Sequence, residues 1–177
     1  LEALEPAPRY LVASGSLPPG VDDGLYARVA RLARERGMRL ILDTSGEPLR
    51  SALEEPIYLV KPSRREFAEL TGQELASDEA ERLEQVRGAL EESRAEIMVV
   101  TMGAEGSVLA TRGQQLRARP PELEALSPVG AGDSFVALMA LKLAQRRPLE
   151  EALRYAVAGA AAAVLTPGSQ LCRAEDV

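Results

Sequence analysis

Short apolar runs alternate with segments of helical periodicity along the whole chain. Each run is followed by a loop rich in Gly, Pro or Ser, which is typical of strands in a sheet. Because runs such as Leu40-Ile41-Leu42 are apolar on both faces, we expect an α/β fold with a mostly parallel sheet and helices on both faces. The predicted strands are residues 10–14, 38–43, 57–60, 97–101, 106–111 and 116–119, and the predicted helices include residues 78–93, 131–146 and 149–165.

Five polar or glycine-rich segments each follow a predicted strand. In an open parallel sheet, ligands bind at the carboxyl ends of the strands. We therefore expect these segments to face one rim of the sheet and to form a binding site there. No linker or internal repeat divides the sequence, so we expect a single domain over residues 1–177. The five segments are residues 14–16, 43–45, 61–63, 101–103 and 127–133.

The most informative segment is the junction between a loop and an apolar helix at residues 127–134. Gly130 and Gly132 let a phosphate approach the backbone, and the first amides of a helix carry the positive end of its dipole. Asp133 is unfavourable beside a phosphate unless it binds a metal or takes a proton from the attacking nucleophile. The junction therefore indicates phosphoryl-transfer chemistry.

Other interpretations of this junction stay open at the level of sequence. Asp133 or Ser134 alone would also serve as the N-cap of the helix, with the glycines in a tight turn. The sequence contains no Gly-x-x-x-x-Gly-Lys-[Ser/Thr] pattern, which excludes a P-loop NTPase. Gly130-Ala131-Gly132 lacks the third glycine of the dinucleotide fingerprint, which disfavours a Rossmann dehydrogenase.

Composition narrows the chemistry further. The chain has 177 residues, 46% hydrophobic and 27% charged, which suits a globular domain with a core. The net charge of −6 gives no basic surface for nucleic acid or anionic lipid. With no histidine and only Cys172, the chain cannot form a His-based triad, a usual zinc site or an internal disulfide. The sequence has neither a bilayer-length apolar run nor a signal pattern, so we expect a cytoplasmic protein.

Several of these segments together resemble the PfkB family of sugar kinases, whose fold is ribokinase-like. Gly130-Ala131-Gly132-Asp133 matches the second signature of the family, residues 60–66 its Lys-Pro-Asn-x-x-Glu segment, and residues 100–106 its nucleotide loop. The resemblance covers nearly the whole chain. The phosphofructokinase and tagatose-phosphate kinase branch is the most similar one, on residues 14–20, 43–47, 127–129 and 166–172.

The resemblance implies a role for each motif. Asp133 would be the catalytic base that takes the proton from the sugar hydroxyl. The amides of Gly130, Ala131 and Gly132 would hold the transferring phosphoryl group. Ser14 would contact the phosphosugar together with Asp133, although a strand-end residue is the alternative for Ser14. The implied ATP site consists of Lys61, Ser63, Thr101, Met102, Gly103, Ala104, Glu105 and Gly106, with a turn between two strands as the alternative for residues 101–106.

The resemblance also implies bound cations. Glu66 would hold Mg²⁺ through water. Position 63 departs from the family pattern, because it is Ser rather than Asn and its polar arm is shorter. From the residues themselves, Ser63 and Glu66 also have the spacing of a capping box, which does not exclude metal binding. A monovalent cation such as K⁺ would lie on Ser127, Val129, Ala163, Thr166, Gly168 and Gln170.

The resemblance to full-length members of the family also implies a segment outside residues 1–177. We expect an N-terminal portion with a lid to precede Leu1, so that residues 1–177 form the C-terminal, nucleotide-binding portion of a sugar kinase. The implied reaction is ATP-dependent phosphorylation of a phosphosugar, fructose 6-phosphate to fructose 1,6-bisphosphate. The alternatives are 1-phosphofructokinase or tagatose-6-phosphate kinase activity, or a nucleotide-binding fragment without catalysis. We expect the fragment alone to be inactive and the full-length protein to be a homodimer that binds neither nucleic acid nor membranes.

Overall fold

The computed structural model describes residues 5–167 and 177. The chain forms two compact units. The first comprises the residues up to Thr101 together with Val108–Gln115, and the second comprises Met102–Ser107 and the residues from Leu116 onward. The single domain expected from the sequence stays a prediction.

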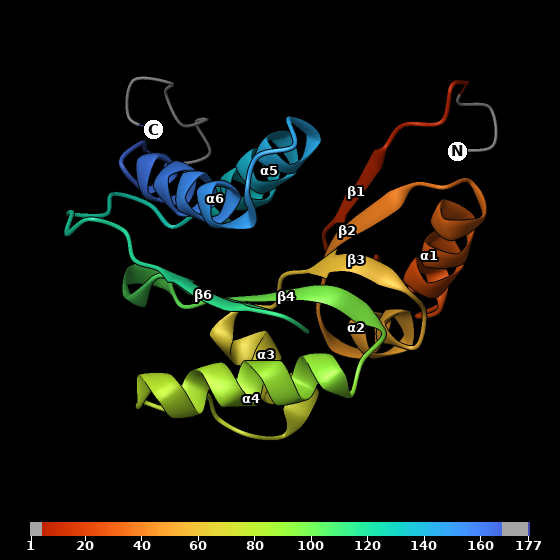
Figure 1. Ribbon diagram of the computed structural model, residues 1–177, viewed down its shortest axis with the longest axis horizontal. Coiled ribbons are helices and arrows are strands. Elements are labelled where there is room, and N and C mark those ends of the chain that lie inside the picture. Colours follow the sequence, from red (N-terminus) through yellow and green to blue (C-terminus); the bar gives the residue numbers. More distant parts are fainter. Residues whose placement is uncertain (1–4, 168–176) are drawn as a thin grey trace. The chain divides into compact units, whose positions relative to one another are not determined.

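Strands and helices alternate through the first two thirds of the chain, and two helices follow (Figure 1). Each predicted strand and helix is present, with ends shifted by one or two residues. The strands are β1 (Tyr10–Ser14), β2 (Arg39–Asp43), β3 (Ile57–Val60), β4 (Ala95–Thr101), β5 (Ser107–Thr111) and β6 (Gln115–Ala118). The helices are α1 (Leu25–Glu35), α2 (Gly46–Leu53), α3 (Arg64–Thr71), α4 (Glu79–Glu91), the short 3-10 helix η1 (Gly103–Glu105), α5 (Ala131–Ala144) and α6 (Leu149–Val164).

The sheet has the strand order β1-β2-β3-β4-β5-β6, and its first four strands are parallel. Because these parallel strands follow one another in chain order, right-handed crossovers place α1 to α4 on the same face. Short connections join β4, β5 and β6, and such connections allow only antiparallel pairing. The sheet is therefore mixed, with the mostly parallel character that the sequence predicts.

The apolar strands of the first unit are buried on both sides of the backbone. Ile41 and Leu42, whose side chains alternate across β2, are both fully buried, and Val60 and Met98 are buried in the same way on β3 and β4. This is the burial that a run without alternating polar residues predicts. The carboxyl ends of these strands are consequently held in fixed positions by a packed core.

In the second unit, α5 and α6 pack closely because small residues lie between them. A Cβ added to Gly159 would lie 2.2 Å from Cδ1 of Leu138 and 3.5 Å from the carbonyl oxygen of Ser134. Ala162 and Ala163 are buried on the same helix. The alanine-rich sequence of α6 is therefore a consequence of helix packing.

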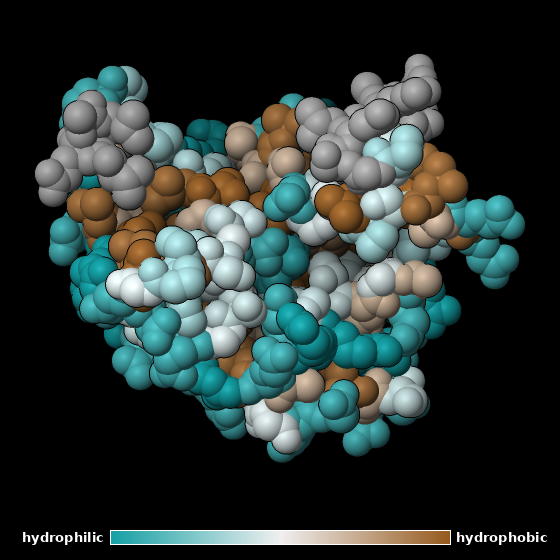
Figure 2. Space-filling view, turned by 180° about the vertical axis from the view of Figure 1, so that it is seen from behind, coloured by the Kyte–Doolittle hydropathy of each residue, from teal (hydrophilic) through white to brown (hydrophobic). Residues whose placement is uncertain are grey.

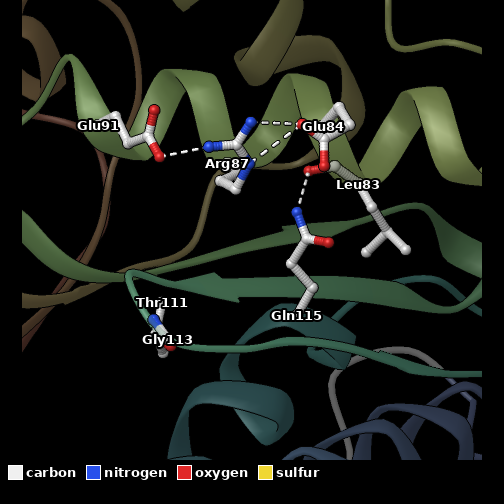
Figure 3. A network of polar contacts seen from close by, with 7 residues as sticks. All are labelled: Leu83, Glu84, Arg87, Glu91, Thr111, Gly113 and Gln115. Carbon is white, nitrogen blue, oxygen red and sulfur yellow. Dashed lines mark hydrogen bonds and ion pairs between the residues drawn. The ribbon is translucent and has the colours of Figure 1, made fainter.

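Polar contacts connect α4 to Gln115 at the start of β6, and both lie in the first unit (Figure 3). Gln115 Nε2 at the start of β6 donates to the Leu83 carbonyl of α4 at 3.2 Å. On the same helix, Arg87 pairs with Glu84 and with Glu91. The hydrogen bond from Arg87 is the main reason that the pKa of the Glu84 carboxyl lies below its ordinary value. Exposed pairs of this kind orient side chains but stabilise a fold little.

In the view of Figure 2, apolar residues (brown) gather at the upper left and are scattered among polar ones (teal) elsewhere. Scattered exposure of this kind is ordinary for a folded protein. Among the residues that the structure describes, no helix is both long and apolar enough to span a membrane.

Candidate functional site

Three neighbouring strands of the first unit end in polar residues that lie side by side. Ser14 at the end of β1 is in register with Asp43 at the end of β2. Asp43 Oδ1 lies 3.0 Å from Nζ of Lys61, the residue after β3. The Lys61 side chain is only 5% exposed, so its ammonium group is held against the carboxylate. The structure thus brings together three of the segments that the sequence places on one rim.

The rim continues to β4 through the next residues of the chain. Ser63 forms an isolated parallel bridge with Thr101, and the Thr101 amide donates to the Pro62 carbonyl at 3.1 Å. Ser63 and Thr101, both expected in the ATP site, are therefore neighbours. In the first unit the expected site residues occupy adjacent strand ends from β1 to β4.

Ser63 and Glu66 form the capping box at the start of α3. Ser63 Oγ accepts from the Glu66 amide at 3.3 Å, and Glu66 Oε2 accepts from the Ser63 amide at 2.7 Å. The capping-box interpretation is therefore confirmed. Since a carboxylate has two oxygens with several lone pairs, this bond leaves Glu66 acceptor capacity for a metal-bound water.

The donor set suits magnesium held through water better than a metal enclosed by protein. Among residues 5–167 and 177, no group of three or more His, Cys, Asp or Glu side chains is placed to hold a metal ion. Mg²⁺ commonly keeps several waters and is bound by one or two carboxylates together with substrate phosphates. One carboxylate at a helix start, Glu66, fits that requirement.

The loop after β4 is closed by its own backbone. The Met102 amide donates to the Gly106 carbonyl at 2.8 Å, and the Gly106 amide donates to the Gly103 carbonyl at 2.9 Å. Gly106 has φ of +88°, and a Cβ there would lie 2.1 Å from the Ala118 carbonyl oxygen. The turn geometry is therefore present, and Gly106 is needed for the approach of β6 whatever else the loop binds.

In the second unit, α5 begins at Ala131 with Gly130 as its N-cap residue. Gly130 is left-handed, with φ of +82°, and its carbonyl accepts from the Ser134 amide at 2.9 Å. The alternative that Asp133 or Ser134 is the N-cap is therefore wrong, because the left-handed glycine starts the helix earlier. Asp133 lies in the first turn of α5 and is exposed.

The first turn of α5 presents amides that a helix cannot satisfy internally. Ala131, Gly132 and Asp133 are its first three residues, and such amides have no acceptor within the helix. The Ala131 amide makes only a long bond of 3.4 Å to the Pro128 carbonyl. The positive end of the helix dipole and the exposed Asp133 carboxylate are thus combined in one turn.

The expected residues of the monovalent cation site lie partly together in the second unit. The Leu126 and Ser127 amides both donate to the Val164 carbonyl, at 2.7 and 3.3 Å, which joins the loop before α5 to the end of α6. There the Ala163 carbonyl accepts from the Thr166 amide and hydroxyl at 3.2 and 2.8 Å. These two bonds reduce the capacity of the Ala163 oxygen for a cation. Gly168 and Gln170 lie outside the described residues.

Three further residues take part in contacts around the rim, and only Tyr26 lies outside the segments that the sequence places there. Asp43 pairs with Lys61, and the hydroxyls of Thr44 and Tyr26 both donate to the Gly15 carbonyl. Asp43 and Thr44 follow a predicted strand, so the strand-end rule already points to them. Tyr26 carries no such signal. It lies on α1, whereas its partner Gly15 lies in the loop before that helix.

Comparison with known proteins identifies the family. The model of the pfkB family of carbohydrate kinases matches residues 2–176. The ATP-dependent 6-phosphofructokinase isozyme 2 of Mycobacterium tuberculosis is 41% identical over 168 residues, which are 95% of this chain and 49% of that protein. A 1-phosphofructokinase of Xanthomonas campestris is 42% identical over 153 residues, which are 84% of this chain and 48% of that protein.

A solved structure gives the same answer for the fold. Phosphofructokinase-2 from Escherichia coli, in complex with potassium, matches with a TM-score of 0.87 and 38% identity over 94% of this chain and 54% of that one. The ribokinase-like fold expected from the sequence is therefore confirmed. The chain spans about half the length of the curated relatives it matches. It belongs to the pfkB family of carbohydrate kinases.

Proposed function

We propose that the complete gene product transfers a phosphoryl group from ATP to a hydroxyl group of a phosphosugar. The observation that carries the proposal is the start of α5, where Gly130 adopts a left-handed conformation and the first-turn amides precede an exposed Asp133. Phosphoryl transfer needs positioning and charge stabilisation more than covalent chemistry. A helix start with a carboxylate supplies, in one turn, amides that stabilise the charge of the phosphoryl group and a base for the sugar hydroxyl.

Each element of this turn has a separate task in the proposal. The amides of Gly130, Ala131 and Gly132 hold the transferring group, since they are donors directed along the positive end of the helix dipole. Asp133 accepts the proton of the sugar hydroxyl as that oxygen attacks. A carboxylate serves as base because the hydroxyl becomes far more acidic as its bond to phosphorus forms.

The nucleotide lies, in the proposal, along Lys61, Ser63 and residues 101–106. ATP bound there supplies the phosphoryl group, and Mg²⁺ neutralises charge on its phosphates. Glu66 holds the waters of that magnesium ion. Asp43 positions Lys61, because the 3.0 Å ion pair fixes the place of the Lys61 ammonium group.

A monovalent cation and a second subunit complete the proposal. The matching Escherichia coli structure is described as a complex with potassium, and we propose K⁺ near Ser127, Val129 and Thr166 in this protein. We also propose that the full-length protein is a homodimer. Another structure of the Escherichia coli protein is described as a tetrameric inhibited form.

Fructose 6-phosphate is the proposed acceptor. Two 6-phosphofructokinases are 41% and 39% identical over 95% and 94% of this chain, whereas 1-phosphofructokinases that match over 94% and 90% of it are 30% and 33% identical. The higher identity over nearly the whole chain favours the first substrate. Activity on fructose 1-phosphate or tagatose 6-phosphate is the second candidate, and a nucleotide-binding protein without catalysis is the third.

A substrate panel on the complete gene product tests the proposal. ATP and Mg²⁺ are supplied with fructose 6-phosphate, fructose 1-phosphate or tagatose 6-phosphate, and ADP release is measured together with ATP binding by calorimetry. We expect the highest kcat/KM on fructose 6-phosphate. A higher kcat/KM on another sugar would identify that sugar as the substrate instead. ATP binding without turnover on any sugar would support the non-catalytic alternative.

A further inference from the structure

The backbone of Gly15 is held by three hydrogen bonds from two neighbouring segments. Its amide donates to the Asp43 carbonyl at 2.9 Å. Its carbonyl accepts from the Tyr26 hydroxyl at 2.8 Å and from the Thr44 hydroxyl at 3.0 Å. Tyr26 and Thr44 are only 8% and 5% exposed, so both hydroxyls are committed to this oxygen in surroundings with little water.

This arrangement determines where the next amide points. Gly15 lies between Ser14 and Ser16, and all three are exposed. In a trans peptide the carbonyl and the following N–H point in opposite directions. Because the Gly15 carbonyl points toward Tyr26 and Thr44, the Ser16 amide points away from them. Gly15 also has φ of +108°, a conformation that side chains other than glycine rarely adopt.

Further hydrogen bonds hold the segment after Ser16. The Val21 amide donates to the Pro18 carbonyl at 3.2 Å, and the Gly24 amide donates to Asp22 Oδ1 at 2.6 Å. The loop forms one wall of an open hollow of about 450 Å³, which Ser16 and Ser45 both line. A donor at Ser16 is therefore presented from a preformed loop beside a cavity.

We propose that Tyr26 and Thr44 are positioning residues for the phosphosugar. By holding the Gly15 carbonyl inward, they orient the Ser16 amide toward the phosphate group of that substrate. This inference rests on the proposed function, together with the contact between Ser14 and the phosphosugar that the family resemblance implies. It adds two residues that do not contact the substrate and act through one peptide group. Preorganised donors bind an anion without reordering the loop on binding.

Two substitutions remove the hydroxyls with little change in volume. Tyr26→Phe and Thr44→Val are made in the complete gene product, with Thr44→Ser as the conservative variant that keeps the hydroxyl. Thr71→Val is the matched control, because the Thr71 hydroxyl donates to the Phe67 carbonyl at 2.9 Å at the end of α3. The measurements are KM for fructose 6-phosphate and for ATP, kcat, and calorimetric Kd for fructose 6-phosphate, fructose and inorganic phosphate.

We expect Tyr26→Phe and Thr44→Val to raise KM and Kd for fructose 6-phosphate by about 5- to 10-fold, the size of one lost hydrogen bond to an oriented group. KM for ATP and the weak binding of fructose stay unchanged. Thr44→Ser and Thr71→Val behave as the wild type. Equal weakening of inorganic phosphate and fructose 6-phosphate binding identifies the phosphate as the group recognised.

The outcomes separate this inference from the proposed function. If the wild type is active and the two substitutions lower only thermal stability, or weaken ATP and sugar equally, the inference is wrong and the proposed function stands. If the wild type binds fructose 6-phosphate without turnover and both substitutions weaken that binding, the inference stands without the proposed reaction. A wild type that neither binds nor phosphorylates a phosphosugar overturns both.

Discussion

The charged side chain of Lys61 is almost entirely buried, and its ammonium group is paired with the carboxylate of Asp43. Removing one member of such a pair leaves the other charge buried without its compensation, which is far more destabilising than loss of an exposed pair. The pair lies at the ends of β2 and β3, next to Ser14. It therefore links the stability of the rim to the placement of the groups that are proposed to bind substrate.

We expect Lys61→Met to lower the free energy of unfolding by about 3 kcal/mol, because Asp43 keeps its carboxylate without the ammonium group. The double variant Lys61→Met with Asp43→Asn recovers part of this loss. Denaturant unfolding of Lys61→Met, of Asp43→Asn and of the double variant measures the coupling. A single variant within about 0.5 kcal/mol of the wild type would mean that the pair is effectively solvated.

Glu66 has two roles that one substitution separates. Gln forms a capping box as Glu does, so Glu66→Gln should leave the stability of α3 nearly unchanged. A neutral amide attracts metal-bound water less than a carboxylate does, so the Mg²⁺ concentration needed for half-maximal activity should rise. Titration of activity with Mg²⁺ checks this in the complete gene product. An unchanged magnesium requirement would mean that Glu66 acts only in the capping box of α3.

Ser63→Asn complements that experiment, because it restores the longer polar arm of the family pattern. We expect it to leave the magnesium requirement unchanged or to lower it. Asn also caps helices, so α3 should persist. A higher magnesium requirement in Ser63→Asn would mean that the shorter serine is adapted to its own geometry.

At the scale of elements, glycines with the same appearance in the sequence have different tasks. Gly106 has φ of +88° and would place a Cβ 2.1 Å from a backbone oxygen of β6, whereas a Cβ on Gly113 meets nothing within 4 Å. Gly130 is left-handed and begins α5. Only the folded backbone distinguishes these three positions.

We expect Gly106→Ala to destabilise the protein by more than about 2 kcal/mol, because the clash is with backbone and the φ value is unfavourable for alanine. Gly113→Ala, on the hairpin turn, is the matched control and should be neutral or slightly stabilising. Thermal unfolding of both variants tests the difference. Equal melting temperatures would show that β6 does not approach Gly106 as closely as described.

The elements themselves could be predicted from the sequence because each is a local pattern. Apolar runs gave β1 to β4, and helical periodicity gave α5 and α6 within one or two residues. The start of α5 could not be assigned between Gly130 and its neighbours, since that depends on a backbone conformation. The contact of Tyr26 with Gly15 could not be predicted either, because it joins a helix to a loop that no sequence pattern connects.

At the scale of the whole molecule, the expected site residues fall in both compact units. Ser14, Lys61 and Ser63 belong to the first, whereas Gly130 and Asp133 belong to the second. The rule that ligands bind at the carboxyl ends of parallel strands predicted the site residues of the first unit. Roles such as base or phosphosugar contact came from the family resemblance, because a carboxylate at a helix start has the same appearance whether or not it takes a proton.

The proposed activity also depends on more than this chain. The chain spans about half the length of the relatives it matches, so catalysis is a property to be measured on the complete gene product. Stability effects at Gly106 or Lys61 can be measured by unfolding. The role of Asp133 can be decided only by turnover.

The most direct test is therefore the steady-state kcat of Asp133→Asn in the complete gene product, with ATP, Mg²⁺ and fructose 6-phosphate. Asn has the same size but cannot accept the proton, so kcat should fall by about 10² to 10⁴ while ATP affinity changes little. Glu150→Gln, which removes a first-turn carboxylate from α6, is the control and should keep kcat. If Asp133 acted only on the helix dipole, Asn would cost under about 1 kcal/mol of stability and kcat would stay near that of the wild type, which would contradict its role as the base.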